Sequence, residues 1–431
     1  MTFRRISSVG VLAAALAVAS YGGFRVGLGG REPRVALRVA SVGLLPDTLP
    51  TSSALRDTAP DEDMPPVDTY QEALDTIHQR YYGSLPKSTE YTTDQLLTYA
   101  AIRGMLGSLG DRYTRFLTPG EYRDMMDENH GEFSGIGARL DARASQVIVV
   151  DTIEGSPARK AGLKPGDHIV KVDNTVITSS KVDDAVKLIR GERGTAVALT
   201  VERKGVKHPL VFHVVRDIVE FDNVVTQVLP GNIGYMSLSS FNDQSDRRVG
   251  EALGKLQAKK VRGLIFDLRW NPGGLLEQAV AISSRFVHSG PIVWIKERGG
   301  KPESMDAIRV KRSVGHIPVV ILINKYSASA SEIVSGAIKD TKSGTLVGST
   351  TWGKGLVQTI NPIATDNSAV LITTHRYYTP AMVDINKKGI APDVFVNVTD
   401  KDFAKVQQTR KLMDDPQIAK GVAVLQAKLR G

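Results

Sequence analysis

Two stretches, GLIFDLRWNPGG at residues 263–274 and PVVILINKYSASASE at residues 318–332, decide the fold. Each begins with an apolar run of strand length, passes through a turn of small and polar residues, and continues into a helical pattern. A buried strand, a turn and a helix, repeated, are typical of an α/β core. In such a core the reactive groups lie in the turns that follow the strands. We therefore expect the functional site of the protein to lie in the two turns at residues 269–274 and 324–332.

A compact α+β pattern occupies residues 131–217, on the amino-terminal side of this core. Its strands are predicted at residues 146–153, 167–172, 195–201 and 210–215, and its main helix at residues 181–190. This amount of chain is enough for one domain of ordinary size.

The amino-terminal end has the pattern of an export signal. Arg4 and Arg5 precede an uncharged, apolar stretch at residues 6–24. We assign residues 1–30 to a signal peptide or a membrane anchor, because the apolar run is about the minimum length for spanning a bilayer. Residues 31–66, where Pro, Asp, Ser and Thr become frequent, are predicted to be a flexible tether.

Helical periodicity predicts an N-terminal helical region at residues 67–130 and a C-terminal helix at residues 401–431. The α/β core is assigned to residues 218–400, between the α+β domain at residues 131–217 and that C-terminal helix. An apolar fraction of 42% and a charged fraction of 23% are those of a soluble globular protein. The net charge of +9 is dispersed, which favours an anionic envelope over nucleic acid as a neighbour. The absence of cysteine excludes disulfides, thiolate metal sites and a Cys nucleophile.

Three serines alternate with alanines in SASASE at residues 327–332. A serine in the first helical turn lies beside unpaired N–H groups and a partial positive charge, which suit a nucleophile and an oxyanion. The same serines could simply cap the helix, since Ser is a preferred capping residue. This stretch alone leaves both readings open.

An activating base must come from elsewhere, because none of the eight histidines lies in a turn that suggests pairing with these serines. Lys354, in WGKGLVQ at residues 352–358, is a candidate, since burial can keep a lysine neutral near pH 7. An ordinary surface lysine is the alternative. The turn NPGG at residues 271–274 could expose N–H groups to the same cleft, or be a plain tight turn.

Together these motifs resemble the carboxyl-terminal processing peptidases, which are serine endopeptidases with an embedded PDZ domain. The resemblance rests on residues 267–274, 327–332 and 353–358, and on Ser329 and Lys354 lying 25 positions apart. It extends to residues 111–119, 377–380 and 389–393, whereas residues 381–386 depart from the family pattern.

The resemblance implies that Ser329 is the nucleophile, that Lys354 is the base and that Gln358 orients the lysine. It also implies an oxyanion hole made by the N–H groups of Gly274 and Ala330, with Gly273 as a substitute for Gly274.

The stretch FSGIGA at residues 133–138 looks like the carboxylate-binding loop of a PDZ domain, and SPARKAGLKPGD at residues 156–167 resembles the signature that follows it. A Gly-x-Gly loop can hold a carboxylate with successive N–H groups while the adjacent strand edge accepts a peptide. The resemblance therefore implies capture of an apolar C-terminus, with Arg190 as a candidate gating residue. The residues assigned to this capture are Gly135, Ile136, Gly137 and Ala138.

We therefore expect a multidomain α+β protein with an N-terminal helical segment, a PDZ-like domain and an α/β serine-protease core of the Clp/crotonase-like type. The expected partners are polypeptides with apolar C-termini, and an adaptor protein, membrane anchoring and homo-oligomer formation stay open. No metal, organic cofactor or nucleic acid is expected, and the expected location is extracytoplasmic, in the periplasm or cell envelope. The rival functions are a catalytically silent PDZ adaptor and a hydrolase of small esters or amides.

Overall fold

The computed structural model describes residues 66–88, 90–143, 146–177, 182–220, 222–309, 314–399, 402, 406, 409 and 411–430. The predicted signal or anchor and the predicted tether lie outside these residues. The described chain divides into one unit that ends at Gly110 and another that begins at Asp111. No helix within the described ranges is long and apolar enough to cross a bilayer.

The smaller unit contains two helices, α1 (Pro66–Arg80) and α2 (Thr93–Gly107). Thr92 caps α2 by accepting a hydrogen bond from the Gln95 N–H, while the Gln95 side chain accepts one from the Thr92 N–H. This reciprocal pair satisfies two donors at the helix start, which is why the sequence TTDQ begins a helix here.

The α+β domain predicted at residues 131–217, called the second domain below, is a sheet with two helices. Its strands are β3 (Ala138–Arg143), β4 (Gln146–Thr152), β5 (His168–Val172), β6 (Thr175–Val176), β7 (Ala196–Glu202) and β8 (Leu210–Val215), and its helices are α4 (Pro157–Ala161) and α5 (Val182–Ile189). The sheet order is β3-β4-β5-β7-β8, with β6 beside β5. Alternate residues of the strands, such as Val147, Ile169 and Leu199, are fully buried in one core. The period-2 patterns thus form the predicted strands.

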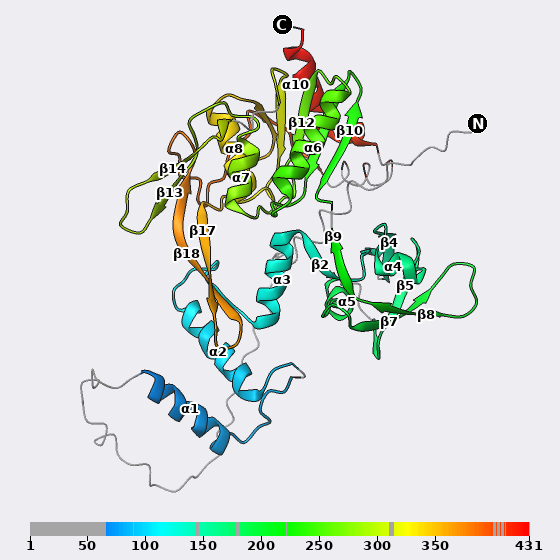
Figure 1. Cartoon of the computed structure of the whole chain (residues 1–431), viewed down its shortest axis with the longest axis vertical. Helices are drawn as coiled ribbons and strands as arrows, with labels where there is room; N and C mark the ends of the chain where they lie inside the picture. Colours follow the sequence, from blue (N-terminus) through cyan, green and yellow to red (C-terminus); the bar gives the residue numbers. More distant parts are fainter. Residues whose placement is uncertain are drawn as a thin grey trace, which may run out of the picture. The chain divides into compact units, whose positions relative to one another are not determined.

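Two crossings connect this domain to the catalytic core. The chain enters through helix α3 (Pro119–His130) and strand β2 (Glu132–Gly135), and it leaves through β9 (Asp217–Glu220). Strands β2 and β9 pair antiparallel, so the two crossings run side by side (Figure 1). Gly131 ends α3 with a left-handed backbone, φ 76°, which glycine adopts without steric cost.

The catalytic core is built on a six-stranded sheet. Its strands, in spatial order, are β10 (Val224–Leu229), β11 (Ile233–Leu238), β12 (Gly263–Asp267), β15 (Val319–Ile323), β16 (Thr345–Gly348) and β19 (Val394–Phe395). From β11 to β19 all neighbours are parallel, and β10 is antiparallel to β11. Every residue of β12 and β15 is buried, because helices cover both faces of the sheet.

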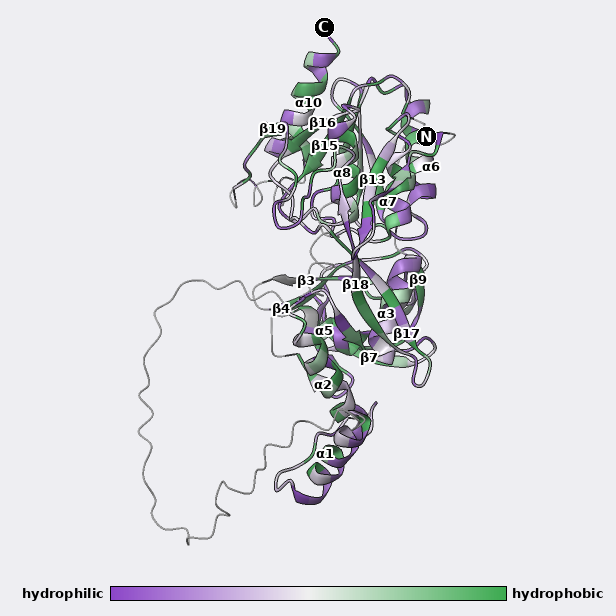
Figure 2. Cartoon of the chain, turned by 90° about the vertical axis from the view of Figure 1, so that its left-hand side faces the viewer, coloured by the Kyte–Doolittle hydropathy of each residue, from purple (hydrophilic) through white to green (hydrophobic). Residues whose placement is uncertain are grey.

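Helices α6 (Ser245–Ala258), α7 (Leu276–Ser283) and α8 (Ala330–Asp340) pack on one face of this sheet, and α10 (Pro416–Lys428) packs on the other. Leu264 and Phe266 of β12 face the first group, while Ile265 between them faces α10. Figure 2 shows hydrophobic residues along β15 and α8, where the two layers meet.

A second sheet joins the core to the start of this unit. It contains β1 (Arg115–Leu117), β13 (Pro291–Glu297), β14 (Glu303–Asp306), β17 (Leu356–Ile363) and β18 (Ser368–Tyr378), with β18 paired to β1, β13 and β17. Strand β1 therefore places residues 111–116 beside the hairpin that follows Lys354.

The C-terminal helix is fixed by a buried ionic network. Arg269 contacts Asp267 and Asp415 at 2.7 Å each, and donates to Gln417 at 2.9 Å. Asp415 also accepts hydrogen bonds from two N–H groups at the start of α10. The predicted helix at residues 401–431 is thus represented by a short 3-10 helix, Leu412–Asp414, and by α10.

Candidate active site

The predicted site lies at the carboxyl ends of three neighbouring parallel strands. The turn at residues 268–275 follows β12, the serine turn follows β15, and the lysine loop follows β16. Backbone hydrogen bonds join successive turns: the Ala328 N–H donates to the Asn271 carbonyl at 3.1 Å, and the Trp352 N–H donates to the Ser327 carbonyl at 3.0 Å. Adjacent parallel strands therefore bring residues far apart in sequence to one edge of the sheet.

The structure distinguishes the three serines of the SASASE motif. The Ser327 hydroxyl donates to the Leu268 carbonyl at 2.8 Å, and the Ser331 hydroxyl donates to the Asn271 carbonyl at 3.0 Å. Both residues are fully buried, so these hydroxyls hold the turn together. Ser329 is partly exposed, and its hydroxyl, unlike those of Ser327 and Ser331, donates no hydrogen bond to a backbone carbonyl of the described residues. It is therefore the one serine of the motif whose oxygen is available to a substrate.

Ser329 also has a strained backbone. Its φ is 55° and its ψ is −115°, a conformation that a non-glycine residue rarely adopts. The strain lies immediately before helix α8, where the N–H groups of the first turn have no partner within the helix. Gly273 approaches so closely that a Cβ there would lie 2.7 Å from the Ser329 Cβ. The glycine turn and the serine are thus in direct contact.

Lys354 has the protonation behaviour that a general base needs. Burial and, after it, the positive charge of Arg115 lower its pKa from 10.5 to about 8, although the Glu332 carboxylate opposes them. The ammonium lies over the ring of Tyr113, 5.1 Å from its centroid. No side-chain hydrogen bond joins Lys354 to Ser329 in the described structure. Catalytic hydrogen bonds are often long before substrate binds.

Residues 111–115 surround the lysine, a role that the sequence did not indicate. Tyr113 lies beneath the ammonium, and the charges of Arg115 and Asp111 act on the lysine pKa in opposite directions. The segment resembles a family motif in the sequence, but nothing in its residue pattern announces that it lies beside residue 354. Only the pairing of β1 with β18 brings it there.

Glu332 is a second residue that sequence analysis missed. This fully buried carboxylate accepts hydrogen bonds from the Ser329 N–H (2.9 Å), the Thr351 hydroxyl (2.5 Å), the Gly353 N–H (2.7 Å) and the Lys354 N–H (2.9 Å). Burial raises its pKa above the ordinary value, and these donors oppose the rise. Four donors leave no place for a carboxyl proton, so Glu332 is ionised. It joins the nucleophile turn to the lysine loop.

Tyr377 joins the same two segments from β18. Its hydroxyl donates to the carbonyls of Ser329, at 3.2 Å, and Lys354. Burial raises the pKa of Tyr377 well above its ordinary value, so the phenol stays a donor. With Glu332 on the N–H groups and Tyr377 on the carbonyls, the backbones of both residues are held.

The two glycines proposed for the oxyanion hole differ in their hydrogen bonds. The Gly273 N–H donates to the Asn271 side-chain oxygen at 2.9 Å, so it is already engaged. No hydrogen bond within the described residues uses the N–H of Gly274 or Ala330. Gly274 has φ 144°, and a Cβ there would lie 2.0 Å from the Phe241 carbonyl oxygen, so only glycine fits. The arrangement favours Gly274 over Gly273 as a donor.

Gln358 lies at a bulge in β17, four positions after the lysine. Its side-chain amide donates to the Thr373 hydroxyl at 3.4 Å, and no hydrogen bond connects it to Lys354 in the described structure. The predicted orienting role of Gln358 therefore stays a prediction.

The predicted tail-binding loop begins where β2 ends. Ile136 is buried in the core of the second domain, and its carbonyl accepts a hydrogen bond from the Ala158 N–H at 2.7 Å. Gly137 has φ 71° and lies against Ser156, where a Cβ would be 2.4 Å away. Strand β3, which begins at Ala138, pairs with β4 alone and is an edge of its sheet.

Arg190, the candidate gating residue, lies at the end of α5. It forms an ion pair with Glu128 of α3 at 3.7 Å. Burial raises the pKa of Glu128, and the charge of Arg190 opposes that rise. This ion pair connects the second domain to α3.

Comparison with known proteins identifies both domains. Residues 148–203 match the PDZ domain, and residues 232–396 match peptidase family S41. The chain is 40% identical over 319 residues to a carboxy-terminal-processing protease of Bartonella bacilliformis, covering 72% of each protein. It is 34% identical over 340 residues to the carboxy-terminal processing protease CtpA of Bacillus subtilis, covering 79% of this chain and 70% of that protein.

A solved structure from Bacteroides fragilis, assigned to the S41 proteases, superposes with a TM-score of 0.53 at 14% identity. It covers 82% of this chain and 96% of the other, which supports the fold alone. The identities to the two processing proteases over most of their lengths carry the assignment. The chain belongs to the carboxy-terminal-processing proteases of peptidase family S41, and it is a serine peptidase with a PDZ domain.

Proposed function

We propose that Ser329 is the nucleophile of this peptidase and that Lys354 is its general base. The observation that carries the proposal is the contrast within the SASASE motif, where only Ser329 is partly exposed and only its hydroxyl donates no hydrogen bond to the surrounding backbone. The lysine in the adjacent loop supports it, because its pKa of about 8 leaves about a tenth of the molecules with a neutral amine at pH 7.

In the proposed mechanism, the neutral Lys354 amine takes the Ser329 proton as the hydroxyl oxygen attacks the scissile carbonyl. The N–H groups of Gly274 and Ala330 stabilise the oxyanion, an interaction that contributes about 3 kcal/mol per donor. The ammonium then protonates the departing amine, leaving an acyl-enzyme. Lys354, oriented by Gln358, next removes a proton from water as the water attacks the ester. The ammonium returns this proton to the Ser329 oxygen as the acyl product leaves.

The PDZ domain gives this peptidase polypeptide substrates, and we propose that it captures their apolar C-termini. The loop of Gly135, Ile136, Gly137 and Ala138 would hold the terminal carboxylate, and the unpaired edge of β3 would add the substrate tail as a further strand. Val182 and Val186, partly exposed one helical turn apart on α5, offer apolar contact to the tail.

The proposed location is extracytoplasmic, in the periplasm or cell envelope, and its support is the export pattern of residues 1–30. Membrane anchoring by residues 6–24 and binding of an adaptor or a second copy are further parts of this proposal. Fractionation of cells that produce the full chain, with and without residues 1–30, tests the location.

A cleavage assay tests the catalytic proposal. The full chain, Ser329→Ala, Lys354→Ala and the exposed control Ser304→Ala would be incubated with a loosely folded protein that ends in an apolar tail. We expect cleavage by the wild type and Ser304→Ala only. Activity of Ser329→Ala would contradict the proposal.

The same assay separates the rival functions. Tail binding without cleavage would favour a silent PDZ adaptor, and cleavage of small esters without cleavage of any protein would favour a small-molecule hydrolase. A matched substrate with a charged tail tests the PDZ role: equal turnover of the two tails would refute capture of apolar C-termini.

A further inference from the structure

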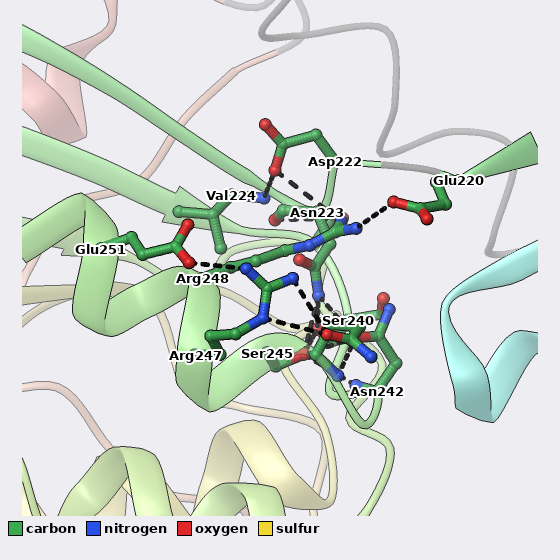
Figure 3. A network of polar contacts seen from close by, with 12 residues as sticks. Glu220, Asp222, Asn223, Val224, Ser240, Asn242, Ser245, Arg247, Arg248 and Glu251 are labelled. Carbon is green, nitrogen blue, oxygen red and sulfur yellow. Dashed lines mark hydrogen bonds and ion pairs between the residues drawn. The ribbon is translucent and has the colours of Figure 1, made fainter.

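A buried polar cluster lies where the chain leaves the PDZ domain and enters the catalytic core. Figure 3 shows it: Asn223, just before β10, points its side-chain amide at the loop of residues 239–245. The amide nitrogen donates to the Ser245 hydroxyl at 2.7 Å and to the Ser240 carbonyl at 2.8 Å. The Ser245 oxygen also accepts from the Asn242 N–H at 2.8 Å. The three side chains, Asn223, Asn242 and Ser245, are buried.

Asn242 takes part as an acceptor. Its side-chain oxygen accepts hydrogen bonds from the Gln244 N–H at 3.1 Å and the Ser245 hydroxyl at 3.0 Å, and lies 3.4 Å from the Asn223 amide nitrogen. The cluster therefore fixes the loop of residues 239–245 from both its ends. The Ser239 N–H adds a further bond, to the Asn223 carbonyl at 3.0 Å.

This loop holds the turn that contains Gly274. The Phe241 N–H donates to the Gly273 carbonyl at 3.0 Å, and the Phe241 carbonyl accepts from the Leu275 N–H at 2.9 Å. These two bonds flank Gly274, whose Cα lies against the Phe241 carbonyl oxygen. The direction of the Gly274 N–H is therefore set by the position of Phe241, which the cluster fixes.

Both crossings to the PDZ domain meet the same loop. At the entry crossing, the Asp243 N–H donates to the Asn129 carbonyl at 2.8 Å, and Gly131 approaches the Asn242 side chain so closely that a Cβ would lie 2.6 Å from it. At the exit crossing, the Asn223 amide donates to the Ser240 carbonyl of the loop, and Arg248 of α6, which follows the loop, lies 3.5 Å from Glu220 of β9 (Figure 3). The loop thus contacts the chain on its way into the PDZ domain and on its way out.

We propose that Asn223, Asn242 and Ser245 are positioning residues that aim the Gly274 N–H at the oxyanion. The inference rests on the proposed role of Gly274 in catalysis. They act through Phe241, and so they set the rate of the chemical step without forming the tail site or the lysine site.

Ser245→Ala and Ser283→Ala form a matched pair that tests the inference. Both serines are fully buried in helices of the core, and each substitution removes one hydroxyl, but Ser283 makes no side-chain hydrogen bond with the described residues. We expect Ser245→Ala to lower kcat about ten- to a hundredfold. KM and the midpoint of the pH profile should stay unchanged, because neither the tail site nor Lys354 is altered. Ser283→Ala should keep the wild-type kcat.

The same Asn→Asp change at two positions gives an independent test. Asn223→Asp replaces an amide that donates to the Ser240 and Ser245 oxygens with a carboxylate that cannot donate. Asn242→Asp keeps the side-chain oxygen that accepts from the Gln244 N–H and the Ser245 hydroxyl. We expect the kcat of Asn223→Asp to fall at least about tenfold below that of Asn242→Asp. A merely structural role would instead lower the melting temperatures without this order in kcat.

The controls separate this inference from the proposed function. If Ser329→Ala stays active, the proposed function fails. If Ser329→Ala is inactive but Ser245→Ala and Asn223→Asp keep the wild-type kcat, only the positioning inference is overturned. A shifted pH midpoint in Ser245→Ala would also overturn it, because the effect would then act through Lys354.

Discussion

Replacing Lys354 with methionine should make the protein inactive and more stable. Burial and the charge of Arg115 lower the lysine pKa from 10.5 to about 8. Each pKa unit corresponds to about 1.4 kcal/mol, so at pH 7 the site costs the folded protein about 3 kcal/mol. Methionine has a similar length and no charge, and its sulfur packs well against an aromatic ring such as that of Tyr113. Lys354→Met should remove this cost.

The gain should depend on pH in a defined direction. Between the folded and unfolded pKa values the unfolded chain binds more protons, so the stability of the wild type rises with pH. The advantage of Lys354→Met should therefore be about 3 kcal/mol at pH 7, about 2 kcal/mol at pH 9 and about 1 kcal/mol at pH 10. The variant and the wild type should become equally stable as the pH passes the ordinary lysine pKa.

Calorimetry of the core transition between pH 7 and 10 provides the measurement. For a domain of this size, 1 kcal/mol corresponds to about 2–4 °C, so Lys354→Met should melt roughly 6–12 °C higher at pH 7. Lys301→Met, at an exposed lysine, is the matched control and should melt with the wild type. A Lys354→Met variant that melts with the wild type at pH 7, or a gain that stays constant up to pH 10, would refute the buried-lysine account.

Three further predictions address the groups around the lysine and the C-terminal helix. Glu332→Gln should lower kcat about a hundredfold, because an amide cannot accept all four hydrogen bonds. It should also move the midpoint of the alkaline rise in activity below about 8, because the Glu332 charge raises the lysine pKa and its loss lowers that pKa. The exposed Glu303→Gln is the control, and an unchanged pH profile of initial rates would contradict the prediction. Arg115→Gln should move the same midpoint upward, because Arg115 is the largest charge that lowers the lysine pKa, and a midpoint that stays or falls would exclude that role. Asp415→Ala should destabilise the core by about 3–5 kcal/mol in thermal unfolding, because it leaves the buried Arg269 with one partner fewer. A melting point equal to that of the exposed control Asp306→Ala would show that the network is dispensable.

The sequence predicts the strands and helices of the core well, because their patterns are local. The apolar runs that contain β12 and β15 end in turns whose residues cannot continue a strand, and a helix follows each turn. The resemblance to a known family adds the identity of Ser329 and Lys354. Neither the local pattern nor the chemistry of serine could choose Ser329 over Ser327 and Ser331.

What the sequence did not predict comes from pairing between distant segments. Residues 111–115 reach Lys354 only because β1 pairs with β18, and Asn223 reaches residues 240–245 only through the fold. Glu332 was visible as part of a motif, but its four hydrogen bonds involve residues up to 22 positions away. Such contacts leave no periodic signal in the chain, so a single sequence cannot indicate them.

Glu332 shows why the lysine needs several influences at once. The carboxylate must be charged to accept four hydrogen bonds, yet its charge raises the pKa of Lys354 and so works against the base that it positions. Burial is the largest effect on that pKa and Arg115 the next, and both oppose Glu332. The base can therefore be neutral near pH 8 only because these two effects outweigh the carboxylate. If either is removed, the pKa of Lys354 rises and a smaller fraction of the amine is neutral near pH 8, which ties the activity of the core to Arg115 on a strand from another part of the chain.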